Sequence, residues 1–270
     1  MKQILKLLAV GAITTCSRFI AQMLIPACNQ DILSPSKFCD NGTMPMILSI
    51  YGIFTYTIIA SLYLIVRDQL SGNRWVRGMK YGAACSTIWI IYLLEPLPHV
   101  KPLERIQYPL ANGFAFLVMG IALSLLLTER SFKPKRTVQL RPTSFHIKMI
   151  ISVAGCFFVG RLIQYLLFDI YSSFFYEPVQ TLLWVVVTGI CIGLIMRWFE
   201  AHITDKCAKR KLLLLGGALF GLNLLLFNFF LPIFFQADLV DLLVRSILDI
   251  GAVRLGLLLV LKSDQPARLT

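Results

Sequence analysis

The sequence predicts an all-α integral membrane protein with eight transmembrane helices, arranged as two parallel four-helix repeats with both termini in the cytoplasm. Three observations carry this prediction. The 270-residue chain is 57% hydrophobic and only 15% charged, whereas soluble domains carry about 25% charged residues. It contains eight long apolar runs, and its basic residues gather in alternate loops. These features exclude an ordinary soluble globular protein.

Each apolar run approaches the roughly 20 residues that a helix needs to cross the hydrocarbon core of a bilayer. The third run is the shortest and ends at Pro96-Leu97-Pro98. Little more than Gln236-Ala237-Asp238 separates the last two runs, which predicts a tight helical hairpin. The predicted spans cover residues 7–25, 45–66, 81–97, 107–127, 149–168, 178–196, 212–235 and 239–261.

The positions of the 26 Lys and Arg residues predict the orientation. Nineteen lie in one set of alternate loops and at the termini, whereas only Lys37, Lys101 and Arg105 lie in the other set. Cytoplasmic loops carry the excess of basic residues, so both termini are predicted to be inside. The net charge of +12 therefore mostly records topology, and we expect no nucleic-acid partner. The short loops favour a bacterial cytoplasmic membrane.

Self-similarity along the chain indicates an internal duplication. Four helices return a chain to its starting side, so the two copies would share one orientation. The alternative is chance similarity between apolar segments. The duplication predicts a first repeat at 1–128, a basic cytoplasmic linker at 129–148 and a second repeat at 149–270. The matched residues are Arg18 with Arg161, Pro45 with Pro178, Gly82 with Gly216, and Pro98 with Pro232.

Four arginines and one carboxylate lie deep inside the predicted spans, namely Arg18, Arg161, Arg245, Arg254 and Asp249. An arginine at a helix centre costs about 2.5–3.5 kcal/mol on insertion scales, so it usually has a partner or a function. Arg245 and Asp249 are four residues apart, which predicts a local ion pair on one helix face. That pairing would leave Arg18 and Arg161 without a deep acid of their own.

Each of these two arginines is followed by a glutamine on the same helix face. Such arginines could bond backbone carbonyls near Pro98 and Pro232, line a wet cavity, or hold an anion, because the guanidinium fork suits phosphate or carboxylate. The anion reading predicts a substrate-binding set formed by Arg18, Gln22, Arg161, Gln164, Arg245, Asp249 and Arg254.

One outer segment carries groups that are suited to catalysis. Glu95, His99 and Glu104 supply carboxylates and an imidazole that could act as acid and base on a lipid-linked substrate. The alternative is a solvated loop made rigid by its prolines. Beyond this segment, no residue is assigned a catalytic role.

Cysteine and histidine usage predicts no cofactor and no metal site. The three histidines lie in loops or near span ends, and Cys-x-x-Cys and nucleotide-binding motifs are missing from the sequence. Cys28 and Cys39 share the first outer loop, where a disulfide could form in an oxidising compartment.

Three classes of function remain. The preferred one is a transporter or flippase for an anionic substrate that contains a lipid phosphate, such as a polyprenyl phosphate, bound by the intramembrane arginines. The second is a non-catalytic subunit whose intramembrane charges pair with the helices of a membrane-protein partner. The third is a membrane enzyme that acts on a lipid-linked substrate through Glu95 and His99.

Overall fold

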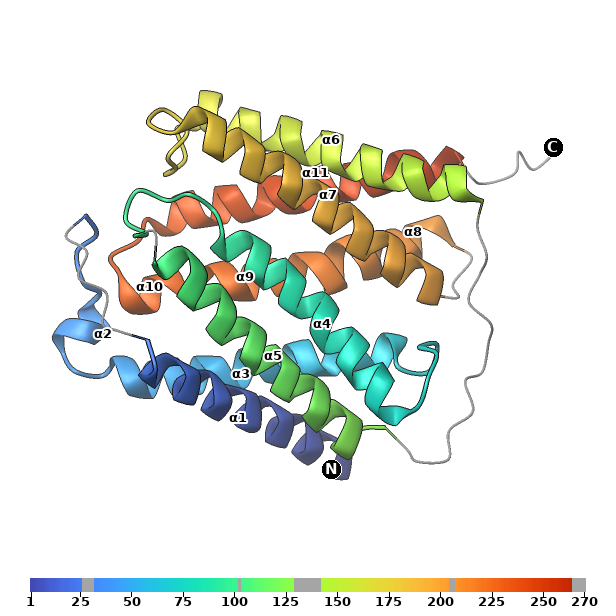
Figure 1. Cartoon of the computed structure of the whole chain (residues 1–270), viewed down its shortest axis with the longest axis horizontal. Coiled ribbons are helices and arrows are strands. Elements are labelled where there is room, and N and C mark those ends of the chain that lie inside the picture. The colour runs from blue at the N-terminus through green and yellow to red at the C-terminus, as the bar shows by residue number, and fades with distance from the viewer. Residues whose placement is uncertain (26–31, 102, 129–141, 204–206, 264–270) are drawn as a thin grey trace. The chain divides into compact units, whose positions relative to one another are not determined.

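The computed structural model is all-α in the part that it describes, which covers residues 1–25, 32–101, 103–128, 142–203 and 207–263 (Figure 1). The chain divides into two compact units. Unit 1 comprises Met1–Thr137 and Leu226–Leu239, and unit 2 comprises Val138–Leu225 and Val240–Thr270. The long helical segment Ala208–Phe234 therefore contributes residues to both units.

In unit 1, helix α1 packs against α3 and α5, and α4 packs against α5. Two short polar residues start helices here by accepting backbone hydrogen bonds, as N-cap residues do. Ser36 caps α2, and the Asn73 side chain accepts from the Val76 amide at 3.0 Å to begin α4. The helices are α1 (Lys2–Met23), α2 (Lys37–Asp40), α3 (Met44–Val66), α4 (Arg74–Leu93), α5 (Glu104–Leu126) and α10 (Leu231–Phe234).

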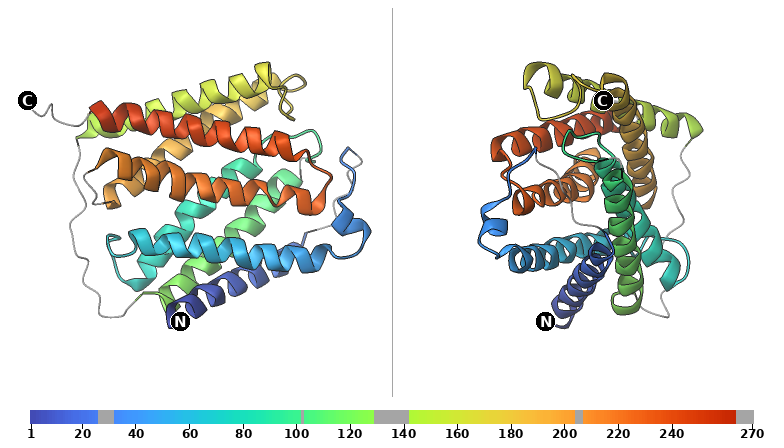
Figure 2. Two further views of the ribbon diagram at one scale, coloured as in Figure 1. Left: turned by 180° about the vertical axis from the view of Figure 1, so that it is seen from behind. Right: turned by 60° about the vertical axis from the view of Figure 1, so that its left-hand side comes forward.

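In unit 2, helix α6 packs against α7, and glycines bring α6 close to α11. Figure 2 shows the turn that joins α10 to α11 from behind. The segment between α8 and α9 is a π-helix of 10 residues, a form that is rare in proteins. The elements are α6 (Thr143–Leu167), α7 (Pro178–His202), α8 (Ala208–Leu212), η1 (Leu213–Leu222), α9 (Asn223–Asn228) and α11 (Leu239–Ser263). The residues of α9 are divided between the two units.

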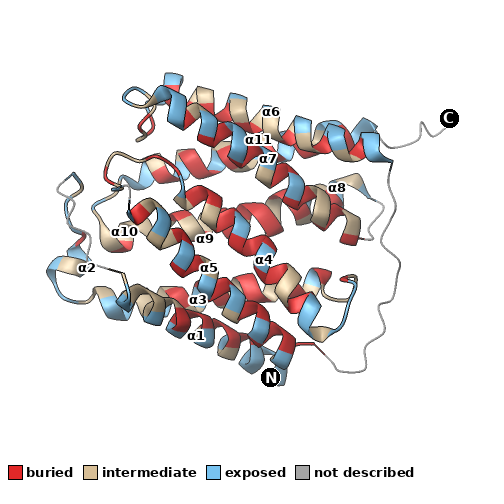
Figure 3. Cartoon of the chain, viewed as in Figure 1, coloured by how far each residue is buried: buried red, intermediate tan, exposed pale blue. Residues whose placement is uncertain are grey.

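Six helical segments are long and apolar enough to cross a membrane, which indicates a multi-pass integral membrane protein. They are α1, α3, α5, α6, α7 and Ala208–Phe234. Helices α4 and α11 are of similar length but carry more polar and charged residues, including Arg77 and Lys80 in α4 and Arg245 and Asp249 in α11. Large apolar side chains are exposed along most long helices (Figure 3), as expected where lipid replaces water.

The predicted basic linker falls largely outside the described part of the chain, since residues 129–141 belong to none of its ranges. Helix α6 begins at Thr143, so the last predicted linker residues, up to Lys148, form its first turns.

Candidate functional site

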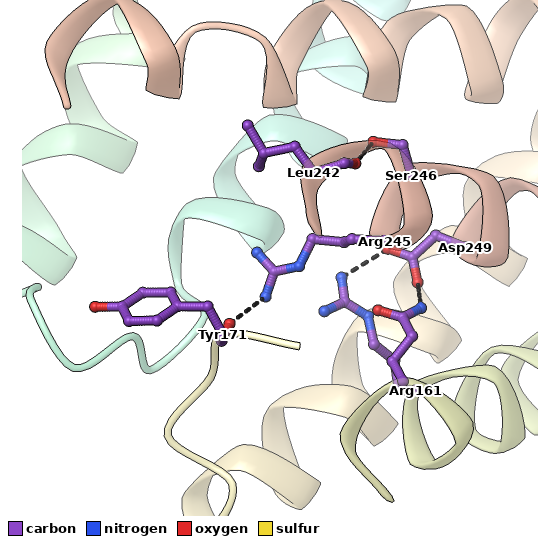
Figure 4. Close-up of polar contacts among 7 residues, drawn as sticks. Arg161, Tyr171, Leu242, Arg245, Ser246 and Asp249 are labelled. Carbon is purple, nitrogen blue, oxygen red and sulfur yellow. Dashed lines mark hydrogen bonds and ion pairs between the residues drawn. The ribbon is translucent and has the colours of Figure 1, made fainter. Parts of the chain in front are cut away.

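The deepest polar cluster lies in unit 2, between α6 and α11. Arg161, Gln164 and Asp249 are all fully buried. The Arg161 Nη2 donates to Asp249 Oδ2 at 2.7 Å, and the Gln164 Nε2 donates to Asp249 Oδ1 at 2.7 Å (Figure 4). Both carboxylate oxygens therefore accept a hydrogen bond, which is the condition for a buried charge pair to be tolerated.

Small residues allow the two helices to approach closely enough for this pair. A Cβ added at Gly256 of α11 would lie 2.7 Å from the Val153 Cα of α6, and one at Gly160 would lie 2.9 Å from the Ala252 Cβ. The Ser152 hydroxyl also donates to the Gly256 carbonyl at 2.9 Å. Close backbones stabilise helix pairs in membranes through packing and interhelical hydrogen bonds.

Aromatic rings enclose the Arg161 guanidinium. Its Cζ lies 4.8 Å from the Trp184 ring centroid and 5.4 Å from that of Phe157. Cation–π contacts of this kind contribute about 2 kcal/mol when the cation is desolvated. Arg161 is therefore held by a carboxylate and by two aromatic side chains at once.

The expectation that Arg161 lacks a deep acid is wrong. Asp249 bonds Arg161, which precedes it by 88 residues. Arg245 donates a hydrogen bond to a backbone carbonyl. The Arg245 Nη2 donates to the Tyr171 carbonyl at 3.1 Å, while the Tyr171 amide donates to Asp241 at 3.3 Å. The i, i+4 spacing allowed a local pair, but the contact between α6 and α11 brings another arginine to the carboxylate.

Arg254, the fourth predicted arginine, is exposed on α11. Gly216 of η1 approaches its side-chain stem.

Arg18 of unit 1 has a different environment. It is part-buried on α1, and its Nη1 donates to Gln22 Oε1 at 2.8 Å. The phenol groups of Tyr56 on α3 and Tyr108 on α5 lie within electrostatic reach of the guanidinium. Within the ranges that the structure describes, Arg18 forms no ion pair with a carboxylate. That Arg18 lacks an acid of its own stays a prediction.

The three side chains of unit 1 that were considered for catalysis are buried. Relative exposures are 3% for Glu95, 7% for His99 and 8% for Glu104, so the solvated-loop alternative is wrong for these three side chains. The His99 ring lies edge-on to Phe235 at 5.6 Å between centroids, and Glu104 Oε2 accepts from the Lys101 amide at 3.0 Å.

The Cys39 Sγ lies 3.3 Å from the Phe234 carbonyl oxygen. Its predicted disulfide partner, Cys28, lies outside the described ranges, so the disulfide stays a prediction. Within the described ranges, no group of three His, Cys, Asp or Glu side chains is placed to hold a metal ion.

Sequence reasoning missed a buried ion pair in unit 2 between Glu200 and Lys211, where the Lys211 Nζ donates to Glu200 Oε1. Both residues lie close to the short connection between α7 and α8. Their opposite charges could have indicated an ion pair. It also missed Tyr56 and Tyr108 beside Arg18, for which the sequence carries no direct signal.

No protein-family model matches the sequence, and comparisons with curated proteins and with solved structures give no significant match.

Proposed function

We propose that the protein is a multi-pass transporter or flippase for an anionic substrate that contains a lipid phosphate, and that Arg18 binds its anionic group. The proposal includes eight spans, with α4 and α11 completing the bundle, and both termini in the cytoplasm of a bacterium. Charged residues within transmembrane helices often line the path of a substrate.

The observation that carries the proposal is the state of Arg18. A part-buried guanidinium on an apolar helix, with Gln22 as its hydrogen-bond partner and no carboxylate beside it in the described ranges, is an electropositive site that an anion would stabilise. Arginine binds phosphate through two parallel hydrogen bonds. A membrane supplies phosphate groups on its lipids, and a polyprenyl phosphate has the same chemistry.

Arg161, Gln164 and Asp249 have a different role in this proposal. Asp249 accepts a hydrogen bond from each of the other two residues, so a substrate that took its place at the Arg161 Nη2 would have to displace it. We assign these residues to the scaffold that holds α6 against α11, and Arg18 to substrate binding.

The test is lipid translocation by the purified chain in proteoliposomes. The probes are fluorescent NBD-labelled phosphatidic acid and, for comparison, NBD-labelled phosphatidylcholine, with inner and outer pools separated by dithionite quenching. We expect Arg18→Gln to reduce phosphatidic acid translocation at least tenfold. Lys6→Gln is the matched control, because it removes a positive charge from an exposed position on the same helix and is expected to leave the rate unchanged. Normal translocation by Arg18→Gln would refute the assignment.

A second candidate function is favoured by the burial of Glu95, His99 and Glu104. Buried imidazole and carboxylate groups are suited to acid–base chemistry on a lipid-linked substrate. Release of inorganic phosphate from a polyprenyl diphosphate by the wild type, lost in both Glu95→Gln and His99→Gln but kept in Arg18→Gln, would support the enzyme over the transporter. Unchanged activity in both outer variants would exclude it.

The subunit alternative is tested separately. A chain whose intramembrane charges serve a partner protein should be inactive alone. Native mass spectrometry of the preparation used for translocation shows whether a second polypeptide is retained. Full translocation by the isolated chain would exclude the subunit role.

A further inference from the structure

A turn at one end of α3 concentrates positive charge. Helix α3 is long and apolar enough to cross a membrane and ends at Val66, and α4 begins at Arg74 (Figure 1). The end of a spanning helix lies at the membrane surface, so the residues that follow it lie near the lipid headgroups. We call residues 67–80 the α3–α4 turn. It carries four basic residues and one acidic residue, namely Arg67, Arg74, Arg77, Lys80 and Asp68.

Two of these cations hold the backbone of the turn in place. The Arg77 Nε donates to the Gly72 carbonyl at 2.9 Å, and the Lys80 Nζ donates to the carbonyl and to the hydroxyl of Ser71, both at 3.1 Å. Gly72 has a φ of +110°, a conformation that glycine adopts without strain. Ser71 precedes Arg74 by three residues, which span at most about 11 Å. The Lys80 ammonium therefore lies close to the start of α4.

Arg74 and Trp75 form a cation–π pair at the start of α4. The Arg74 Cζ lies 5.0 Å from the centroid of the Trp75 ring, and Trp75 itself is 41% exposed. A guanidinium that lies over a ring keeps the N–H donors at its edge available. Tryptophan is enriched at membrane surfaces, where its ring lies at the level of the lipid headgroups. The pair thus combines a ring suited to the headgroup layer with a cation suited to a phosphate.

The positive charges of the turn are compensated unevenly. Arg67 forms an ion pair with Asp68, with 3.2 Å between Nε and Oδ1. Within the ranges that the structure describes, neither Arg74 nor Lys80 forms an ion pair with a carboxylate. Basic segments next to a spanning helix attract anionic lipids, so such lipids can neutralise these two cations.

We infer that the α3–α4 turn binds an anionic membrane lipid. The lipid phosphate accepts hydrogen bonds from Arg74, Trp75 lies among the lipid headgroups, and Lys80 adds a second positive charge. This contact lies at the membrane surface and involves none of the residues assigned to the substrate, so the inference does not depend on the proposed function. Positive charge that served only to orient the chain during insertion would give the folded protein no preference for anionic over zwitterionic lipid.

Native mass spectrometry of the detergent-solubilised full chain tests the inference. The probes are dioleoyl phosphatidylglycerol, which is anionic, and dioleoyl phosphatidylcholine, which is zwitterionic. All chains carry Arg18→Gln, so that the proposed substrate site does not contribute. We expect this parent chain to bind phosphatidylglycerol more tightly than phosphatidylcholine. Adding Arg74→Gln should weaken phosphatidylglycerol binding about fivefold, the contribution of one basic residue near an anionic membrane surface, and should leave phosphatidylcholine binding unchanged.

Lys37→Gln is the matched control for Arg74→Gln. Lys37 is an exposed basic residue of α2, so its substitution removes one positive charge from unit 1 outside the turn. Phosphatidylglycerol binding by this control should equal that of the parent chain. A loss as large as that of Arg74→Gln would show that net charge alone attracts the lipid and would overturn the inference. Equal affinities of the parent chain for the two lipids would also overturn it.

A second substitution keeps the test decisive if Arg74→Gln does not fold. Lys80→Gln removes the other cation of the turn that forms no ion pair in the described ranges, and it should weaken phosphatidylglycerol binding by a similar factor. Binding at the affinity of the parent chain by either folded variant would contradict the inference. Because the parent chain lacks Arg18, the result is independent of whether the wild type translocates phosphatidic acid.

Discussion

Arg18 in unit 1 and Arg161 in unit 2 are both arginines within apolar helices, but their environments differ. Arg161 is fully buried, bonded to Asp249 and enclosed by Trp184 and Phe157. Arg18 is part-buried and bonded to Gln22. In the proposed function, Arg161 belongs to the scaffold that holds α6 against α11, and Arg18 binds the substrate. The two arginines differ in that Asp249 bonds Arg161, whereas Arg18 forms no ion pair with a carboxylate in the described ranges.

The largest effect is expected from removing the carboxylate of unit 2. Asp249→Asn would leave Arg161 buried without its counter-ion, which costs about 3–5 kcal/mol of unfolding free energy for buried pairs. Chemical unfolding in detergent micelles measures the change. Asp40→Asn, at an exposed position of α2, is the control and should change the unfolding free energy by less than about 0.5 kcal/mol.

The double variant Arg161→Met, Asp249→Leu sharpens this prediction. It removes both charges and should destabilise the chain less than Asp249→Asn does, because no buried charge remains unpaired. A double variant less stable than the single one would show that unit 2 depends on the ion pair for reasons other than charge compensation.

An intermediate effect is expected at the close contact that brings α11 to α6. Gly256→Leu would force a side chain against the Val153 backbone, and overpacking of this kind costs about 1–3 kcal/mol. Gly251→Leu on the same helix is the matched control, since a Cβ there meets nothing within 4 Å. Equal unfolding free energies for the two variants would argue against close packing as the support of the ion pair.

The smallest effect is expected from Arg18→Gln. This substitution removes a hydrogen bond to Gln22 and no ion pair among the residues that the structure covers, so the unfolding free energy should change by about 1 kcal/mol or less. A loss as large as that of Asp249→Asn would show that Arg18 is structural, and the contrast between the two arginines would fail.

The helices of this fold could be predicted from hydrophobic runs, because lipid demands long apolar segments wherever a chain crosses it. Each of the eight predicted spans has a corresponding helix, although the ends differ. The helix predicted at 81–97 is α4, which begins at Arg74 because Asn73 caps it. Basic residues in its first turns lower its apolarity, so they shortened the predicted span and leave α4 outside the six candidate spans.

The candidate site was predicted only in part. Arg18, Arg161, Gln164 and Asp249 could be selected as polar residues in apolar segments, since such residues need partners. Which of them pair depends on the faces that helices present to each other, and one chain's sequence does not record that. Spacing along α11 suggested Arg245 as the partner of Asp249, while the close approach of α6 supplied Arg161.

The most direct test measures the unfolding free energy and the translocation of phosphatidic acid on one preparation of Arg18→Gln in proteoliposomes. If Arg18 binds the substrate, the unfolding free energy should lie within about 1 kcal/mol of the wild type, and phosphatidic acid translocation should fall at least tenfold. Translocation at the wild-type rate would contradict it, and so would a loss of translocation that merely follows a loss of folded protein.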